Sequence, residues 1–120
     1  MNKNSLTLRE IFDEAQLNYQ KRDLSVAENL CYKILSIDPN HFASIRLLSD
    51  ISAVNKNFTK AIEFLNQAIE IKPKNIALLN NLGTAYKELG QLEKSIDLYD
   101  KVLTIDPKNG NAHYNLGLVY

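Results

Sequence analysis

Hydrophobic positions recur at helical spacing along most of the chain, most clearly between residues 75 and 107. Apolar side chains three or four positions apart predict a first helix: Leu78, Leu82, Ala85, Tyr86 and Leu89. After the tight turn that Gly90 permits, another stripe predicts a second helix: Leu92, Ile96, Tyr99, Val102 and Leu103. Pro107 ends this helix by about Asp106, because proline lacks an N–H and keeps the preceding residue out of helical geometry. One such hairpin cannot bury both of its apolar faces alone.

The hairpin recurs along the chain with a period of 34 residues. Three kinds of large residue keep this period: Pro39, Pro73 and Pro107; Ile37, Ile71 and Ile105; Leu24, Phe58 and Leu92. Small residues keep it as well: Ala15, Ser49, Gly83 and Gly117. A helical hairpin repeated at this period is the signature of the tetratricopeptide repeat (TPR), and the chain resembles that family from about Leu8 onward.

The resemblance implies an all-α fold, a right-handed α-solenoid of about seven antiparallel helices. Repeats are expected over residues 8–41, 42–75 and 76–109, with a half repeat over 110–120 after a disordered N-terminal tail of residues 1–7. Outside the central hairpin, the expected helices cover 8–21, 24–37, 41–54, 58–71 and 109–120.

The first unit departs from the pattern of the others. Glu14 stands where later repeats carry leucine, which suits the exposed end of a stack. Thr7 and Glu10 fit a capping box, and Leu17 or Asn18 is expected to turn inward. In the second unit the turn at residues 55–57 has no glycine, and we expect its asparagines to tolerate the left-handed geometry.

Composition narrows the class of partner. Fourteen basic and fourteen acidic side chains cancel, so a polyanion such as nucleic acid is not indicated. The single cysteine, Cys31, lies on the apolar stripe of its helix, where a buried small hydrophobe is expected and a reactive thiol is the alternative. No signal peptide or membrane span is evident, so we expect a cytoplasmic protein.

In TPR proteins the first helix of each repeat lines the concave wall, and the resemblance therefore implies a groove for an extended peptide or partner protein. The residues expected to line it are Phe12, Gln16, Tyr19, Arg46, Asp50, Asn80, Asn81, Thr84, Lys87, Asn111, Tyr114, Asn115 and Leu118. Amides suit such a groove because they both donate to and accept from a peptide backbone.

Asn81 and Asn115 each precede a Leu-Gly pair, which is similar to the TPR arrays of O-GlcNAc transferases. In those arrays an asparagine at this place holds the substrate backbone, whereas the alternative here is a simple exposed amide. Leu47 interrupts the asparagine ladder in the middle repeat. Arg46 and Lys87 are the only candidates for a clamp on a C-terminal carboxylate, so we do not favour that mode.

Nothing in the sequence indicates an enzyme. His41 and His113 have no cysteine or carboxylate partner at ligand spacing, and Asp38 and Asp106 belong to helix-ending Asp-Pro turns. We therefore expect no catalytic residue, cofactor or metal, and interpret the chain as a scaffold or adaptor for other proteins. The alternatives are the N-terminal recruiting part of a larger glycosyltransferase or sulfotransferase, and a scaffold that assembles with itself.

The self-assembly hypothesis concerns the last helix. His113, Leu116 and Tyr120 are expected on a face that no second helix covers. A bare solenoid end exposes apolar surface, so a homodimer through this end is predicted, with Leu116 and Tyr120 near its centre. The alternative is a monomer with a frayed last helix.

Overall fold

In a computed structural model, which describes residues 6–119, the chain forms seven α-helices and those residues contain no strand. The helices are α1 (Leu8–Gln20), α2 (Leu24–Ile37), α3 (Phe42–Val54), α4 (Phe58–Ile71), α5 (Ile76–Glu88), α6 (Leu92–Ile105) and α7 (Gly110–Val119). The predicted all-α fold is confirmed. The first helices of the hairpins begin 34 residues apart, as the period of the apolar pattern requires.

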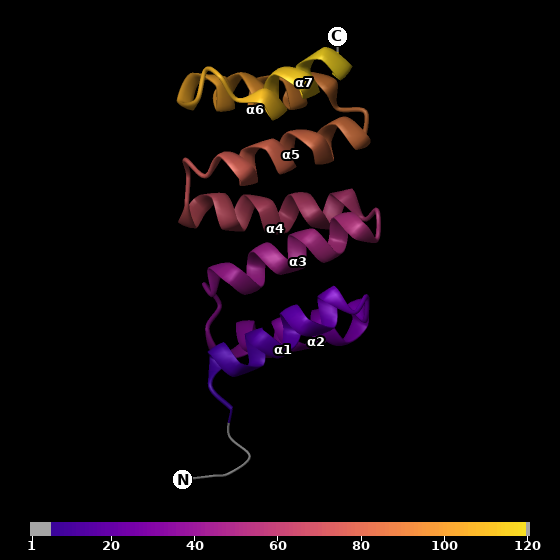
Figure 1. The fold of residues 1–120 in the computed structure, drawn as a ribbon, viewed down its shortest axis with the longest axis vertical. Helices are drawn as coiled ribbons and strands as arrows, with labels where there is room; N and C mark the ends of the chain where they lie inside the picture. The colour runs from indigo at the N-terminus through magenta and orange to yellow at the C-terminus, as the bar shows by residue number, and fades with distance from the viewer. Residues whose placement is uncertain (1–5, 120) are drawn as a thin grey trace.

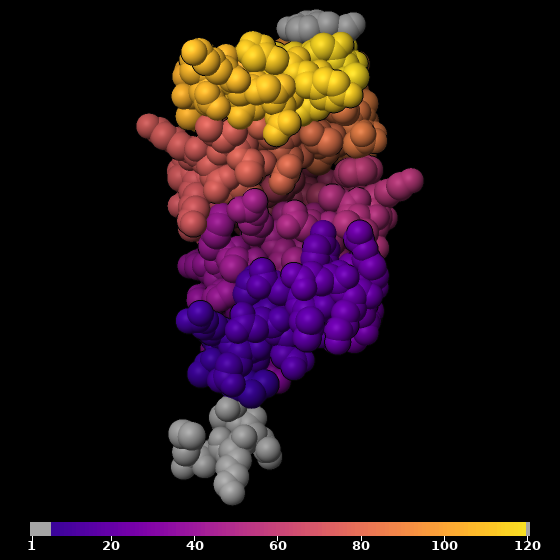
Figure 2. Space-filling model, viewed as in Figure 1, coloured from indigo at the N-terminus to yellow at the C-terminus, as the bar shows by residue number. Residues whose placement is uncertain are grey.

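The helices stack in chain order along one axis, so that colour changes evenly from one end to the other in Figures 1 and 2. The molecule measures 56 × 25 × 20 Å. Each helix packs mainly on its neighbours in sequence, with further contacts between α1 and α3 and between α5 and α7. Stability is therefore expected to come from hairpins and the joints between adjacent hairpins, as in other solenoids.

The turns inside the three hairpins share one geometry. The second residue after each first helix has a positive φ: 67° at Arg22, 59° at Lys56 and 77° at Gly90. Its N–H bonds three residues back and the next N–H bonds five residues back, for example Lys56 to Ala53 at 2.9 Å and Asn57 to Ser52 at 2.8 Å. This is a Schellman motif, which favours glycine. The role predicted for Gly90 is confirmed, but asparagine does not take it in the second hairpin.

The left-handed residue in that turn is Lys56, because the Schellman bonds fix which position must have a positive φ. Asn55 and Asn57 have φ values of −78° and −92°. Asn57 instead caps α4, where its side chain accepts a hydrogen bond from the N–H of Lys60 at 3.2 Å.

Two groups of buried side chains meet at α5. The larger includes Cys31, Ile45 and Leu78, and the smaller joins Leu79 and Tyr99 to α7. The tightest contact lies between α5 and α6: a Cβ placed on Gly83 would approach the Tyr99 ring to 2.7 Å. Tyr99 is fully buried, so its ring cannot move aside into solvent.

The first unit begins as expected and differs in one respect. Thr7 caps α1 in a capping box with Glu10, whereas residues 1–5 of the expected tail lie outside the described part of the chain. Glu14 is exposed. Leu17 does not turn inward but is 46% exposed, while Asn18 is half-buried and donates to the carbonyl of Glu14 at 2.8 Å. The core face of α1 is supplied by Ile11 and Ala15.

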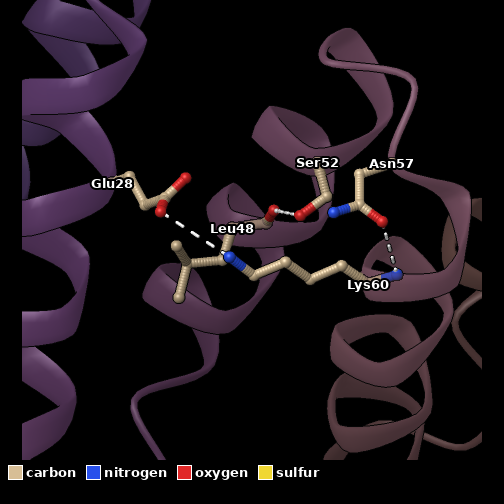
Figure 3. A network of polar contacts seen from close by, with 5 residues as sticks. All are labelled: Glu28, Leu48, Ser52, Asn57 and Lys60. Carbon is tan, nitrogen blue, oxygen red and sulfur yellow. Dashed lines mark hydrogen bonds and ion pairs between the residues drawn. The ribbon is translucent and has the colours of Figure 1, made fainter.

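One ion pair connects the first two hairpins. Figure 3 shows the Lys60 side chain extending from α4 toward Glu28 on α2, with 3.6 Å between Nζ and Oε1. Beside it, the ring of Tyr32 lies 5.5 Å from the same ammonium group. Because these groups are about a third exposed, the pair stabilises the fold by only about 0–1 kcal/mol. Apolar packing therefore determines how the hairpins stack.

We expect Gly83→Ala to lower the free energy of unfolding by about 1–3 kcal/mol, because the new methyl group overlaps the immobile Tyr99 ring. Urea denaturation measures the change. Gly117→Ala is the matched control: it is the equivalent position in α7, and a Cβ there meets nothing within 4 Å. Equal losses for the two variants would show that the ring contact does not limit this position.

We expect Lys56→Gly to raise the free energy of unfolding by about 0.5 kcal/mol. Left-handed geometry costs a non-glycine residue about 1–2 kcal/mol, which the substitution removes. Glycine also has greater conformational freedom in the unfolded chain, which reduces this gain in stability by about 0.4–1 kcal/mol. Chemical denaturation tests this against Asn55→Gly, which alters a neighbouring residue with negative φ and should only destabilise. A loss of stability in both variants would contradict the prediction.

Candidate functional site

A hollow of about 230 Å³ opens between the α3–α4 hairpin and α5. We call it the α3–α5 hollow. Its lining residues are Tyr19, Ser49, Asp50, Ala53, Val54, Phe58, Ala61, Leu65, Asn81, Thr84 and Ala85. Most of the lining is apolar, with a few polar groups among the apolar walls. This is the usual composition of a ligand-binding cavity.

The hollow brings together four residues that were expected to line the groove. Tyr19 comes from α1, Asp50 from α3, and Asn81 and Thr84 from α5. Three successive first helices therefore contribute to one surface, and Asp50 and Thr84 do so from equivalent positions 34 residues apart. Thr84 is fixed in place: its hydroxyl donates to the carbonyl of Asn80 at 3.1 Å and lies 2.9 Å from the hydroxyl of Tyr99.

Asp50 is the only carboxylate in this lining. Its side chain is half-buried, and among the described residues it forms neither a hydrogen bond nor a salt bridge. Removal from water raises the pKa of the Asp50 carboxyl, and the nearby positive charge of Arg46 lowers it in part. Asp50 is thus a partly desolvated acceptor without a partner.

Asn81 is exposed and makes no hydrogen bond within residues 6–119. Its amide is free to bind a ligand at the hollow. Asn115, the equivalent residue one repeat later, is half-buried on α7 and lies outside the α3–α5 hollow. The structure thus places one asparagine of the expected pair at the hollow.

Asn80 is 7% exposed, and its surroundings give it a structural role. Its Nδ2 donates to Oδ1 of Asn109 at 3.3 Å. The same Oδ1 accepts from the N–H of Ala112 at 2.9 Å, while Nδ2 of Asn109 donates to Asp106 at 3.3 Å. These bonds fix the orientation of both amides and connect α5 to the start of α7.

The other expected groove residues are spread along the first helices. Phe12 packs against the core, with its ring centroid 5.6 Å from that of His41. The remaining ones divide by burial: Arg46 and Lys87 are half-buried, whereas Gln16, Asn111, Tyr114 and Leu118 are exposed. Tyr114 and Leu118 are 69% and 56% exposed, and both lie on α7.

The end of the array differs from expectation at one residue. Leu116 is not exposed on a bare face but is buried beside Tyr99 and Val102, because α7 already packs against α6. His113 is exposed, with a ring nitrogen 2.9 Å from the carbonyl of Pro107. Tyr120 lies outside the described residues. Self-association through this end stays a prediction, and α7 presents Tyr114 and Leu118 to solvent.

Residues 6–119 give little support to a reactive thiol, a metal site or a membrane span. Cys31 is fully buried, and burial together with the charge of Glu28 raises its pKa to about 12, so the thiol stays protonated at neutral pH. Across residues 6–119, no three histidine, cysteine or acidic side chains converge as a metal site would need. Among these same residues there is also no helix of the length and apolar character needed to cross a bilayer.

Sequence reasoning did not identify the apolar walls of the hollow. Ala53 and Val54 were assigned to the helix of residues 41–54 and Phe58 to the 34-residue period, but none of the three was assigned to a site. The available signal was their position on α3, since Ala53 and Val54 follow Asp50 by three and four residues and so share its face. The contribution of Phe58 from α4 depends on the fold of the hairpin and has no such signal.

Comparison with known proteins finds an enzyme among the relatives of this chain. The UDP-N-acetylglucosamine--peptide N-acetylglucosaminyltransferase of Caenorhabditis elegans is 33% identical over 89 residues, which are 74% of this chain and 8% of the enzyme's length. The chain thus corresponds to a small part of that relative.

Two solved structures share the fold. The first TPR of Spaghetti (RPAP3), bound to the HSP90 peptide SRMEEVD, has a TM-score of 0.85 at 19% identity and covers 93% of this chain and 89% of its own. The O-GlcNAc transferase of Thermobaculum terrenum has a TM-score of 0.80 at 23% identity, over 99% of this chain and 23% of the enzyme.

The family assignment rests on the repeat itself. A family model described as "TPR repeat" matches residues 55–90 and 83–120, together more than half of the chain. The matched segments include the Schellman turn at Gly90 and the close approach of Gly83 to Tyr99. With its seven stacked helices and a 34-residue period, the chain belongs to the TPR repeat family.

Proposed function

We propose that the chain is a protein–protein interaction module that binds an extended peptide, or an extended segment of a partner protein, along its first helices. In this role it serves as a scaffold or adaptor. The observation that carries the proposal is the α3–α5 hollow, where apolar walls stand beside the free amide of Asn81. A peptide needs both features, because its backbone requires hydrogen-bond partners and its side chains require apolar seats.

The position of the hollow supports a peptide rather than a small molecule. Its lining includes residues of three successive first helices, and further exposed residues that were expected to line the groove lie on α7. An extended chain can follow such a row, whereas a small ligand occupies a single site. RPAP3, which shares the fold, is bound to a peptide. A cytoplasmic location is part of this proposal.

A second candidate is the recruiting part of a larger transferase. It is favoured by the similarity to the C. elegans glycosyltransferase, of which this chain matches a small part. In this candidate role too the repeats bind a protein, and catalysis would be the task of another domain. The genomic coding sequence that follows Tyr120 distinguishes this candidate from an independent adaptor.

We expect Asn81→Ala to weaken binding of peptides selected from a random-peptide library by about 2–10-fold. That range corresponds to a hydrogen bond of about 0.5–1.5 kcal/mol. The melting temperature should stay the same, because Asn81 is exposed and makes no hydrogen bond within the described residues. Fluorescence anisotropy measures the affinity.

Asn66→Ala is the matched control for this prediction, since Asn66 is an exposed amide on α4, outside the hollow. Its affinity for the same peptides should equal that of the parent protein. Equal affinities for all three proteins would remove Asn81 from the binding site. A library that yields no binding peptide would contradict the proposed function itself.

A further inference from the structure

We propose that the α3–α5 hollow is a subsite for a basic side chain, lysine or arginine, of the bound peptide, and that Asp50 is its counter-ion. The inference rests on the proposed function and adds the class of residue that the groove selects. It is carried by the shape of the hollow and by the charge within it, which point to the same kind of side chain.

The size of the hollow suits one side chain. Its volume of about 230 Å³ is below the ~300–1,000 Å³ of cavities that hold a whole small-molecule ligand. Ala53, Val54 and Phe58 form part of its apolar wall, and Ala85 contributes from α5. Lysine and arginine carry apolar stems that pack against such walls while the charged end reaches a polar partner.

The charge within the hollow is negative and unpaired. Asp50 is the only carboxylate of the lining, and no lysine or arginine is part of that lining. Arg46 is near enough for its charge to lower the pKa of Asp50 in part, but neither Arg46 nor Lys87 forms a salt bridge with Asp50 within residues 6–119. A carboxylate that is partly removed from water without a partner is unfavourable. A cation from the ligand would supply the missing partner.

The neighbouring polar residues are compatible with this occupant. Tyr19 adds an aromatic side chain to the lining, of the kind that attracts cations. Asn81 supplies an amide oxygen that can accept an N–H from the same ligand. Burial raises the pKa of Asp50 and the nearby charge of Arg46 offsets only part of that rise, so a cation bound in the hollow would lower the pKa further.

An acidic peptide is the main alternative occupant. Arg46 and Lys87 are the cations that such a ligand would need, and neither lines the hollow. A carboxylate of the ligand would instead meet Asp50, and two like charges at close range repel one another. The observations therefore favour a basic residue at this subsite.

The test is a selection of peptides from a random library on three proteins: the parent, Asp50→Asn and Asp97→Asn. Asn keeps the shape of Asp and removes its charge. Asp97 is exposed on α6, so its variant makes the same change of net charge away from the hollow. Sequencing of the bound pools gives the residue preference at each peptide position, and thermal melting shows that each variant is folded.

We expect the parent and Asp97→Asn to select lysine or arginine at one position, and Asp50→Asn to lose that preference. A second measurement does not depend on any variant of the protein. Replacing the selected lysine by norleucine in a synthetic peptide should weaken binding to the parent about tenfold or more, because charge-assisted contacts are the stronger ones. The same replacement should change binding to Asp50→Asn much less.

Several outcomes would overturn the inference. They are selected peptides without a basic preference, a preference that persists in Asp50→Asn, selection of acidic residues, or no effect of norleucine. In each of these cases peptide binding itself survives, and the proposed function stands. If no peptide is selected at all, both the function and the subsite are wrong.

Discussion

The contact of the Tyr99 ring with Gly83 sets how closely the two helices of a hairpin approach. The ring takes the space that any side chain on residue 83 would need. The equivalent pairs, one and two periods earlier, are Ser49 with Leu65 and Ala15 with Cys31. Where the small residue is larger, the opposite residue is smaller than tyrosine. The Gly83 and Tyr99 pair thus combines the smallest residue of the three pairs with the largest.

The same packing prepares the candidate site. The hydroxyl of Tyr99 lies 2.9 Å from that of Thr84, so the ring that joins α5 to α6 also holds a residue of the hollow. Ser49, one of the small residues that keep the 34-residue period, lines the hollow from α3. Residues that pack the hairpins and residues that line the hollow thus occupy adjacent positions on α3 and α5. A substitution among the packing residues is expected to alter the residues of the hollow, and the reverse.

The regular features could be predicted from the sequence because each depends on local chemistry. Periodic apolar residues gave α2 and α4 their bounds, and Gly90 marked its turn. The remaining features depend on hydrogen bonds and packing that residue types alone do not specify. Lys56 takes a left-handed geometry that its residue type does not favour, because the Schellman bonds of the turn fix that position. Of the two residues expected to turn inward, Asn18 is half-buried and Leu17 faces solvent. The burial of Asn80 depends on Asn109, 29 residues away, and no pattern in the chain indicates that pair.

The position of the hollow makes it part of a joint. One wall belongs to the α3–α4 hairpin and the opposite wall to α5, and these units are held together by the packing of α4 on α5. In a stack of this kind, curvature is set by the rotation of each hairpin on the next. The same rotation separates or closes the walls of the hollow. Bending of the array and widening of the hollow are then the same motion. An occupant of the hollow would therefore stiffen the molecule, and tension along the long axis of the array would change how well that occupant fits.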